Sequence, residues 1–251
     1  MARPRNSAAL RPTPKAGAIL IGLAMLAACG GSDAPTPDTE APTSTTSTSS
    51  PTNTTEPPAP TTTAPVELEQ LALWPAPSVV FTSPKAAAED FIVQVLGVPP
   101  EIGEFMAGDS RSGEVLVYSP GNPPSPRGLL LLRQLGPSNG WFIIGTINDL
   151  ALITSPESGT SVTAGPLTIE GLAEGFEATV IVEAFIAGRS EPILDREVTF
   201  AGNFGTPGPF QATLDLSAAN PGDTVLIVVR GGVGLETDPG EFGAIAVLIV
   251  E

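Results

Sequence analysis

The stretch PFQATLDL, residues 209–216, alternates apolar and polar side chains over its whole length. Strict alternation is typical of a β-strand that turns one face to a core and the other to solvent. Gln211, Thr213 and Asp215 fall on the solvent face of such a strand. We therefore predict that the opposite face points inward, with Phe210, Ala212, Leu214 and Leu216 in the core.

Similar short runs surround this strand on both sides in the sequence. Each run is rich in branched apolar residues and is bounded by Gly, Pro, Asn or Ser, the residues that make turns. Seven short strands with frequent turns fit an immunoglobulin-like β-sandwich, which we predict for residues 151–251. The strands are expected at 150–154, 166–171, 177–186, 192–199, 209–216, 224–230 and 244–250.

Two of these strands do not alternate. TVLIVVR, residues 224–230, and AIAVLIV, residues 244–250, are apolar on both faces. Either such strands are covered from two sides, or one face is a contact surface for a partner. Under the second hypothesis, the outward positions that would form the interaction surface include Val228 and Val247.

A set of turn and core residues recurs in order through the same region: Ser155-Pro156, Gly159, Pro166-Leu167, Gly171, Phe176-Glu177 and Gly208-Pro209-Phe210. Phe176 and Phe210 are expected to fill the core between the sheets, and Gly171 to permit a positive φ or a bulge. With these residues the region resembles a known family, the immunoglobulin-like domain of bacterial spore germination and related envelope proteins. That family is associated with extracytoplasmic assembly and interaction, so the resemblance implies a sandwich without catalytic residues.

Residues 66–150 predict a small α+β domain. SPKAAAEDFIVQVLG, residues 83–97, has a capping serine, a proline at the first helical position and a glycine at its end. Its apolar residues recur at helical spacing. Three runs then predict strands, at 112–119, 128–135 and 140–147, with GPSNG (136–140) as a hairpin turn. We expect the helix to pack on a small antiparallel sheet and to abut the second domain rigidly.

Two charged loops are candidate binding sites. Residues 108–114 hold Asp109, Arg111 and Glu114, either as a binding loop or as a solvated loop with a local ion pair. Residues 230–243 hold oxygen ligands of the type calcium takes, but their spacing matches no calcium loop. These acids are Glu236, Asp238 and Glu241.

The start of the chain predicts export. Residues 1–28 have a basic beginning, a short apolar run and small residues before Cys29, which is the layout of a secretory signal peptide. Leu26-Ala27-Ala28-Cys29 resembles the lipobox of bacterial lipoproteins. That resemblance implies cleavage before Cys29 and a lipid on its sulfur, so we expect a lipid-anchored protein on the extracytoplasmic face of the cell membrane. Acyl chains in pairs anchor a protein stably.

Residues 29–65 are dominated by Thr, Ser and Pro and predict a disordered tether or stalk. Removal of the signal peptide takes away four basic residues and no acid, and so moves the net charge from −16 to −20. A surface this acidic repels nucleic acid, and we expect no nucleic-acid partner.

Several chemistries are excluded by composition. The chain has no histidine, and its one cysteine is the expected lipidation site, so histidine-based triads and the common zinc sites cannot form. We expect no cofactor and no enzyme activity.

Three functions remain open. The first is a non-catalytic envelope module that binds or scaffolds an envelope protein or a cell-wall polymer. The alternative is a small-ligand carrier, which would need an apolar pocket between the helix after Pro84 and its sheet. The third is a carboxylate-based wall hydrolase.

Overall fold

The computed structural model describes residues 67–251. The predicted signal peptide, the predicted lipidation site Cys29 and the predicted tether at 29–65 lie outside the described residues. In the described part, helix α1 (Pro84–Phe91) begins with proline at its first turn and continues into the π-helical turn η1 (Ile92–Leu96). Gly97 ends it with a φ of 69°, in the left-handed region that glycine tolerates. The predicted helix is thus confirmed, with its last turn wider than an α-helix. Ser83 occupies the N-cap position, but its side chain makes no capping hydrogen bond.

Four antiparallel strands follow in the order β1-β2-β3-β4. Their bounds are β1 (Met106–Ala107), β2 (Ser112–Tyr118), β3 (Pro126–Leu135) and β4 (Gly140–Ile147). The predicted hairpin turn joins β3 to β4, with positive φ at Gly136 and Asn139. The very short β1 was not predicted.

The rest of the chain forms two facing sheets, as an immunoglobulin-like sandwich requires. A three-stranded sheet has the order β10-β7-β5 and a five-stranded sheet the order β6-β12-β11-β8-β9. The bounds are β5 (Ala151–Ser155), β6 (Ser161–Thr163), β7 (Pro166–Ala173), β8 (Thr179–Ile186), β9 (Asp195–Phe200), β10 (Gly208–Asp215), β11 (Thr224–Gly231) and β12 (Phe242–Val250).

The alternation in PFQATLDL is confirmed, because Phe210, Ala212, Leu214 and Leu216 are buried. All seven predicted strands are present within a few residues of the expected bounds. The sequence missed β6, which pairs in parallel with β12. Gly171 lies opposite a register irregularity in β5, and its φ is not positive.

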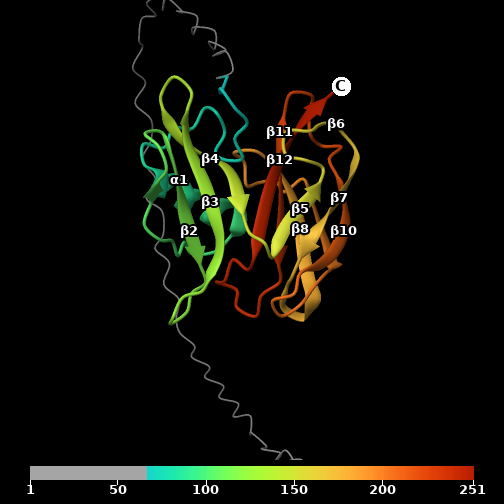
Figure 1. Ribbon diagram of the computed structural model, residues 1–251. Helices are drawn as coiled ribbons and strands as arrows, with labels where there is room; N and C mark the ends of the chain where they lie inside the picture. The colour runs from blue at the N-terminus through green and yellow to red at the C-terminus, as the bar shows by residue number, and fades with distance from the viewer. Residues whose placement is uncertain (1–66) are drawn as a thin grey trace, which may run out of the picture. The chain divides into compact units, whose positions relative to one another are not determined.

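The non-alternating strands are covered on both sides. Strands β11 and β12 lie between the four-stranded sheet and the three-stranded sheet (Figure 1). Alternate residues along them enter two different cores. Leu226, Phe242 and Ala246 pack with helix α1 and one face of the four-stranded sheet. Val225, Ile227 and Ile249 pack against the three-stranded sheet. Residues 67–251 therefore lie in one compact unit whose middle layer is the five-stranded sheet.

This arrangement corrects the predicted interaction surface. Val228 is 1% exposed and packs in the core shared with helix α1, and Val247 is fully buried inside the sandwich. Neither side chain is available to a partner, because the apolar second face serves contacts within the chain.

Candidate functional site

Several exposed apolar side chains lie at one end of the sandwich. Three segments meet there: 174–178 between β7 and β8, 201–207 between β9 and β10, and 231–241 between β11 and β12. We call this the loop end. Backbone hydrogen bonds join the segments, from the Phe176 N–H to the Gly232 carbonyl oxygen at 2.8 Å and from the Gly202 N–H to the Ala173 carbonyl oxygen at 2.8 Å.

Glycine allows this close approach. A Cβ at Gly231 would collide with the carbonyl oxygen of Glu174, and one at Gly175 would collide with the carbonyl oxygen of Thr179. The loop end is therefore fixed by backbone contacts between distant parts of the sequence, which leaves its side chains free to point outward.

Apolar side chains concentrate here. The three exposed phenylalanines of the described residues are Phe176, Phe200 and Phe204, with Phe176 52% and Phe204 82% exposed. Val233 and Leu235 are also exposed and belong to the third segment. Phe176 was predicted to be a core residue, and that prediction is wrong. It follows Gly175 in a short 3-10 turn (Phe176–Ala178) that carries it out of the sheet, whereas Phe210 lies on β10 and is buried as predicted.

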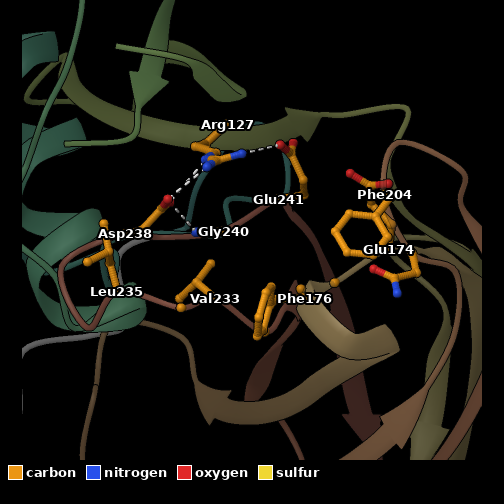
Figure 2. A pocket seen from close by; sticks show the side chains of 14 residues that line it. Arg127, Glu174, Phe176, Phe204, Val233, Leu235, Asp238, Gly240 and Glu241 are labelled. Atoms are coloured by element: carbon orange, nitrogen blue, oxygen red, sulfur yellow. Dashed lines mark hydrogen bonds and ion pairs between the residues drawn. The ribbon is translucent and has the colours of Figure 1, made fainter. Parts of the chain in front are cut away.

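A cleft of about 350 Å³ opens between these segments (Figure 2). Its lining includes Phe176, Phe204, Val233 and Glu174 from the sandwich. Arg127, from strand β3 of the four-stranded sheet, forms part of the same wall. A second groove of about 530 Å³ adjoins it, because both are lined by Phe176, Gly231–Val233 and Asp238.

Arg127 fixes the long segment 231–241. Its Nε and Nη2 donate to Oδ1 and Oδ2 of Asp238 at 3.0 and 2.7 Å, and its Nη1 donates to Oε1 of Glu241 at 2.9 Å. Asp238 Oδ1 also accepts the Gly240 N–H, and Glu241 Oε2 accepts the Asn148 side-chain amide. Burial lowers the pKa of Arg127, but the hydrogen bonds to the two carboxylates raise it, leaving the pKa above its ordinary value.

The acids weighed for calcium therefore have another role. Asp238 and Glu241 are both bound to the guanidinium group of Arg127, so their carboxylates serve contacts within the fold. Among residues 67–251, no three acidic side chains gather in a way that would hold a metal ion. Glu236 lines the second groove instead.

The loop 108–114 is held by residues outside the loop and not only by a local ion pair. Asp109 accepts the Arg111 backbone N–H at 2.7 Å, while the Arg111 side chain donates to the Gln134 carbonyl oxygen and lies 3.7 Å from Glu69. The backbone N–H of Arg111 is the main reason that the pKa of Asp109 is lowered. The structure does not bring this loop to the loop end.

A buried carboxylate lies beneath the second groove. Glu183 of β8 is almost fully buried and stands 3.5 Å from Arg196 Nε and 3.4 Å from Arg230 Nε. Arg230 also donates to the carbonyl oxygen of Leu96 at the end of η1, at 2.8 Å. This cluster joins the helical part of the chain to the five-stranded sheet and uses the charges of both arginines within the fold.

The space that a small-ligand carrier would need is filled. Between helix α1 and its sheet lie large apolar side chains with almost no exposure, among them Phe91, Ile92, Leu130 and Ile143. This packing counts against a ligand cup in the α+β part. Trp141 is buried in this core and packs edge-on against Phe105.

None of the helices in residues 67–251 has the length and hydropathy needed to span a membrane.

Comparison with known families agrees with the fold. Residues 150–231 match the immunoglobulin-like domain of bacterial spore germination. The match confirms the resemblance read from the sequence, and it covers strands β5 to β11 of the sandwich. It stops before segment 232–241 and strand β12, which complete the loop end and the five-stranded sheet. Comparisons with curated proteins and with solved structures gave no match.

Three residues of the site were not predicted from the sequence. Phe204 lies between Asn203 and Gly205 in a loop, and no strand pattern places it in a core. An aromatic residue in such a loop was a signal in the sequence that Phe204 is exposed. Arg127 is one of only seven Lys and Arg residues after residue 28, but nothing local connects it to residues 238 and 241. Glu174 is separated in the sequence from every other residue of the cleft except its immediate neighbours.

Proposed function

We propose that this protein is a non-catalytic lipoprotein of the cell envelope whose sandwich binds a protein partner through the loop end. The exposed side chains of Phe176 and Phe204, which line the same cleft, carry this proposal. Contiguous exposed apolar side chains with a polar rim are a mark of protein contact sites, and aromatic anchors supply much of the energy at such sites. The spore-germination family of the matched domain supports an envelope role of the same general kind.

The position of the loop end favours a contact that faces away from the start of the described chain. Strands β8 and β11 run from the loop end to the opposite end, where Ile186 and Thr224 line a hollow together with Glu67 and Leu68. Eight strand residues span roughly 25 Å. The aromatic surface thus lies at the far end of the sandwich from residue 67, where the described chain begins (Figure 1).

A protein suits this surface better than a wall polymer. Exposed phenylalanines bury a large apolar area against apolar side chains of a partner, and aromatic residues are enriched in protein contact sites. The acidic chain also favours a partner with basic residues. A nucleic-acid partner stays excluded in this proposal for the same electrostatic reason.

Crosslinked capture from the native envelope tests the proposal. The lipidated protein is compared with the variants Phe204→Ser and Val250→Ser. Val250 is an exposed apolar residue at the end of β12, away from the loop end, and serves as the matched control. We expect one recurrent partner protein that is captured by the wild type and by Val250→Ser, and lost with Phe204→Ser. Equal capture by all three proteins would refute the loop end as the contact.

The anchor is tested on the same captured chain by intact mass. We expect cleavage before Cys29 and the added mass of acyl chains, because the sequence before it resembles a lipobox. A lipid-free mass would show that the anchor assignment is wrong while leaving the loop-end contact in place.

A further inference from the structure

The outer edge of strand β9 has hydrogen-bonding groups that the described chain does not use. Within residues 67–251, β9 pairs with β8 alone, and the Ala201 N–H donates to the Ala178 carbonyl oxygen at 3.0 Å just past the end of the strand. Backbone groups alternate in direction along an antiparallel pair, so the odd-numbered residues of β9 direct theirs to β8. The N–H and C=O groups of Arg196, Val198 and Phe200 therefore point away from the sheet.

Strand β10 runs close to β9, but it does not cover that edge. The Thr199 hydroxyl donates to the Gln211 carbonyl oxygen at 3.1 Å, and the Asp195 carboxylate accepts the Asp215 N–H at 2.7 Å. Thr199 and Asp195 are odd-numbered residues of β9, whose side chains point to the three-stranded sheet. These contacts place β10 on the sandwich side of β9 and leave the plane beyond the edge open.

The side chains along the edge are accessible as well. Arg196, Glu197 and Val198 are exposed in succession, and Val198 and Phe200 are 54% and 72% exposed. The Arg196 N–H donates to Asp195 Oδ1 at 2.8 Å, but the N–H groups of Val198 and Phe200 have no partner in the described chain. Unpaired backbone groups on an exposed apolar edge are a template for a further strand.

The other sheet edges of residues 67–251 carry the features by which proteins prevent edge pairing. Strands β1 and β6 are two and three residues long, and β5 breaks its register between Ile153 and Ser155. Strand β10 contains Pro209, which has no N–H, and β4 is covered by backbone hydrogen bonds to residues 73–81. In contrast, β9 keeps an unbroken register over six residues and contains neither proline nor lysine.

We propose that two copies of this chain pair through β9, in antiparallel orientation about a two-fold axis at Val198. The Val198 N–H of each copy donates to the Val198 carbonyl oxygen of the other copy. The Phe200 N–H of each donates to the Arg196 carbonyl oxygen of the other, while the Arg196 N–H keeps its bond to Asp195. The two five-stranded sheets then form one continuous sheet. This surface is separate from the cleft at the loop end, so the inference goes beyond the proposed function.

The side chains of β9 complement one another in this register. Glu197 lies opposite Thr199 of the second copy, and Arg196 lies opposite Phe200, where a guanidinium attracts an aromatic ring. A two-fold axis at Arg196 or Glu197 would instead place like charges opposite each other, which destabilises a strand pair. An axis at Thr199 would leave only three residues of β9 paired. This complementarity of β9 with itself is the reason for assigning the edge to a second copy.

Sedimentation velocity of the full chain tests the pairing. The buffer is reducing, so that Cys29 forms no disulfide, and contains about 0.15 M salt, which screens the repulsion between two acidic chains. We expect a dimer that forms with rising concentration. Val198→Lys and Val198→Glu each place two like charges at the axis and should weaken the dimer about tenfold or more. Val250→Lys is the matched control, because Val250 is exposed on β12 and not on β9.

An equimolar mixture of the two variants tests the register. Opposite charges meet in the mixed pair only if residue 198 lies opposite itself, so the mixture should dimerise more tightly than either variant alone. Hydrogen exchange adds a backbone readout. The amides of Val198 and Phe200 should exchange more slowly as the wild type becomes more concentrated, while the Gly234 amide at the loop end keeps its rate.

Three results would overturn the proposal. The first is a wild type that stays monomeric at every concentration, and the second is a dimer that Val198→Lys and Val250→Lys weaken equally. The third is a mixture of Val198→Lys and Val198→Glu that associates no better than its components. Because Phe204 takes no part in this pairing, partner capture with Phe204→Ser tests the loop end independently.

Discussion

Gly243, on strand β12, shows at the scale of one residue how closely the two sheets of the sandwich approach. A Cβ at this position would collide with the carbonyl oxygen of Ala151 on β5. Gly243→Ala should therefore destabilise the protein by about 2 kcal/mol or more, because backbone must move to admit the methyl group. Urea unfolding at neutral pH measures this loss.

Gly234→Ala is the control for that substitution. Gly234 lies in segment 231–241, and a Cβ there would meet nothing within 4 Å. We expect its stability to match the wild type within about 0.5 kcal/mol. Equal effects of the two substitutions would contradict the close approach of β12 to β5.

A second residue-scale prediction concerns acid stability. Hydrogen bonds from the Ser217 hydroxyl and from its backbone N–H lower the pKa of Asp215 in the folded protein. A lowered folded pKa adds stability above the unfolded value of about 3.9, and this stability is lost as the pH falls through the folded pKa.

Ser217→Ala removes the larger of these two causes. When the pH falls below about 4, the free energy of unfolding should therefore decrease less in this variant than in the wild type. Urea unfolding at pH 7 and pH 3 measures the difference, with Ser138→Ala in the exposed hairpin turn as control. An acid loss identical to the wild type in both variants would show that Ser217 does not set the pKa of Asp215.

At the scale of elements, the ion pairs of Arg127 attach the β11–β12 segment to the four-stranded sheet. The Arg127 side chain is 26% exposed, while the carboxylates it binds are 9% and 12% exposed. Arg127→Ala would leave two nearly buried carboxylates without their cation. We expect a loss of about 2 kcal/mol, below the usual cost of breaking a fully buried pair because of the remaining exposure.

Two measurements check this prediction. Urea unfolding gives the stability, and hydrogen exchange of the Gly240 and Glu241 amides should accelerate in the variant before exchange elsewhere does. Arg133→Ala is the control, since Arg133 lies on the same strand and forms no ion pair within 4 Å among the described residues. Unchanged exchange in segment 231–241 would show that Arg127 does not position it.

The elements themselves were largely predictable from the sequence, because alternation, helical spacing and turn residues act locally. The strand β6 was not, since its three residues are defined only by pairing with β12, far away in the chain. The apolar runs that contain Val228 and Val247 fitted two hypotheses, burial within the chain or contact with a partner. A local pattern does not show what covers each face of a strand. The loop end was missed for the same reason, because it joins segments that are far apart in the sequence.

At the scale of the whole molecule, the α+β part and the sandwich share one core. Phe91 of helix α1 is fully buried, and its ring centroid lies 6.4 Å from that of Phe242 on β12. Phe91→Ala should lower the stability by about 3 kcal/mol or more. We expect the loss to appear in both parts together, as one cooperative transition.

Two probes report on the two parts separately. Fluorescence of Trp74 and Trp141 reports unfolding around the four-stranded sheet. Hydrogen exchange in β7 and β10 reports unfolding of the three-stranded sheet of the sandwich. Val93→Ala is the control, because Val93 is exposed on the next turn of the helix. Separate midpoints for the two probes would show that the parts unfold independently.

The two-faced strand β12 has a consequence for the order of events during synthesis. Residues 242, 244 and 246 belong to one core, and residues 245, 247 and 249 belong to the other. Neither core is complete until β12 has emerged from the ribosome. The chain therefore remains open through most of its synthesis, and its native packing forms only in a late step that closes both cores at once.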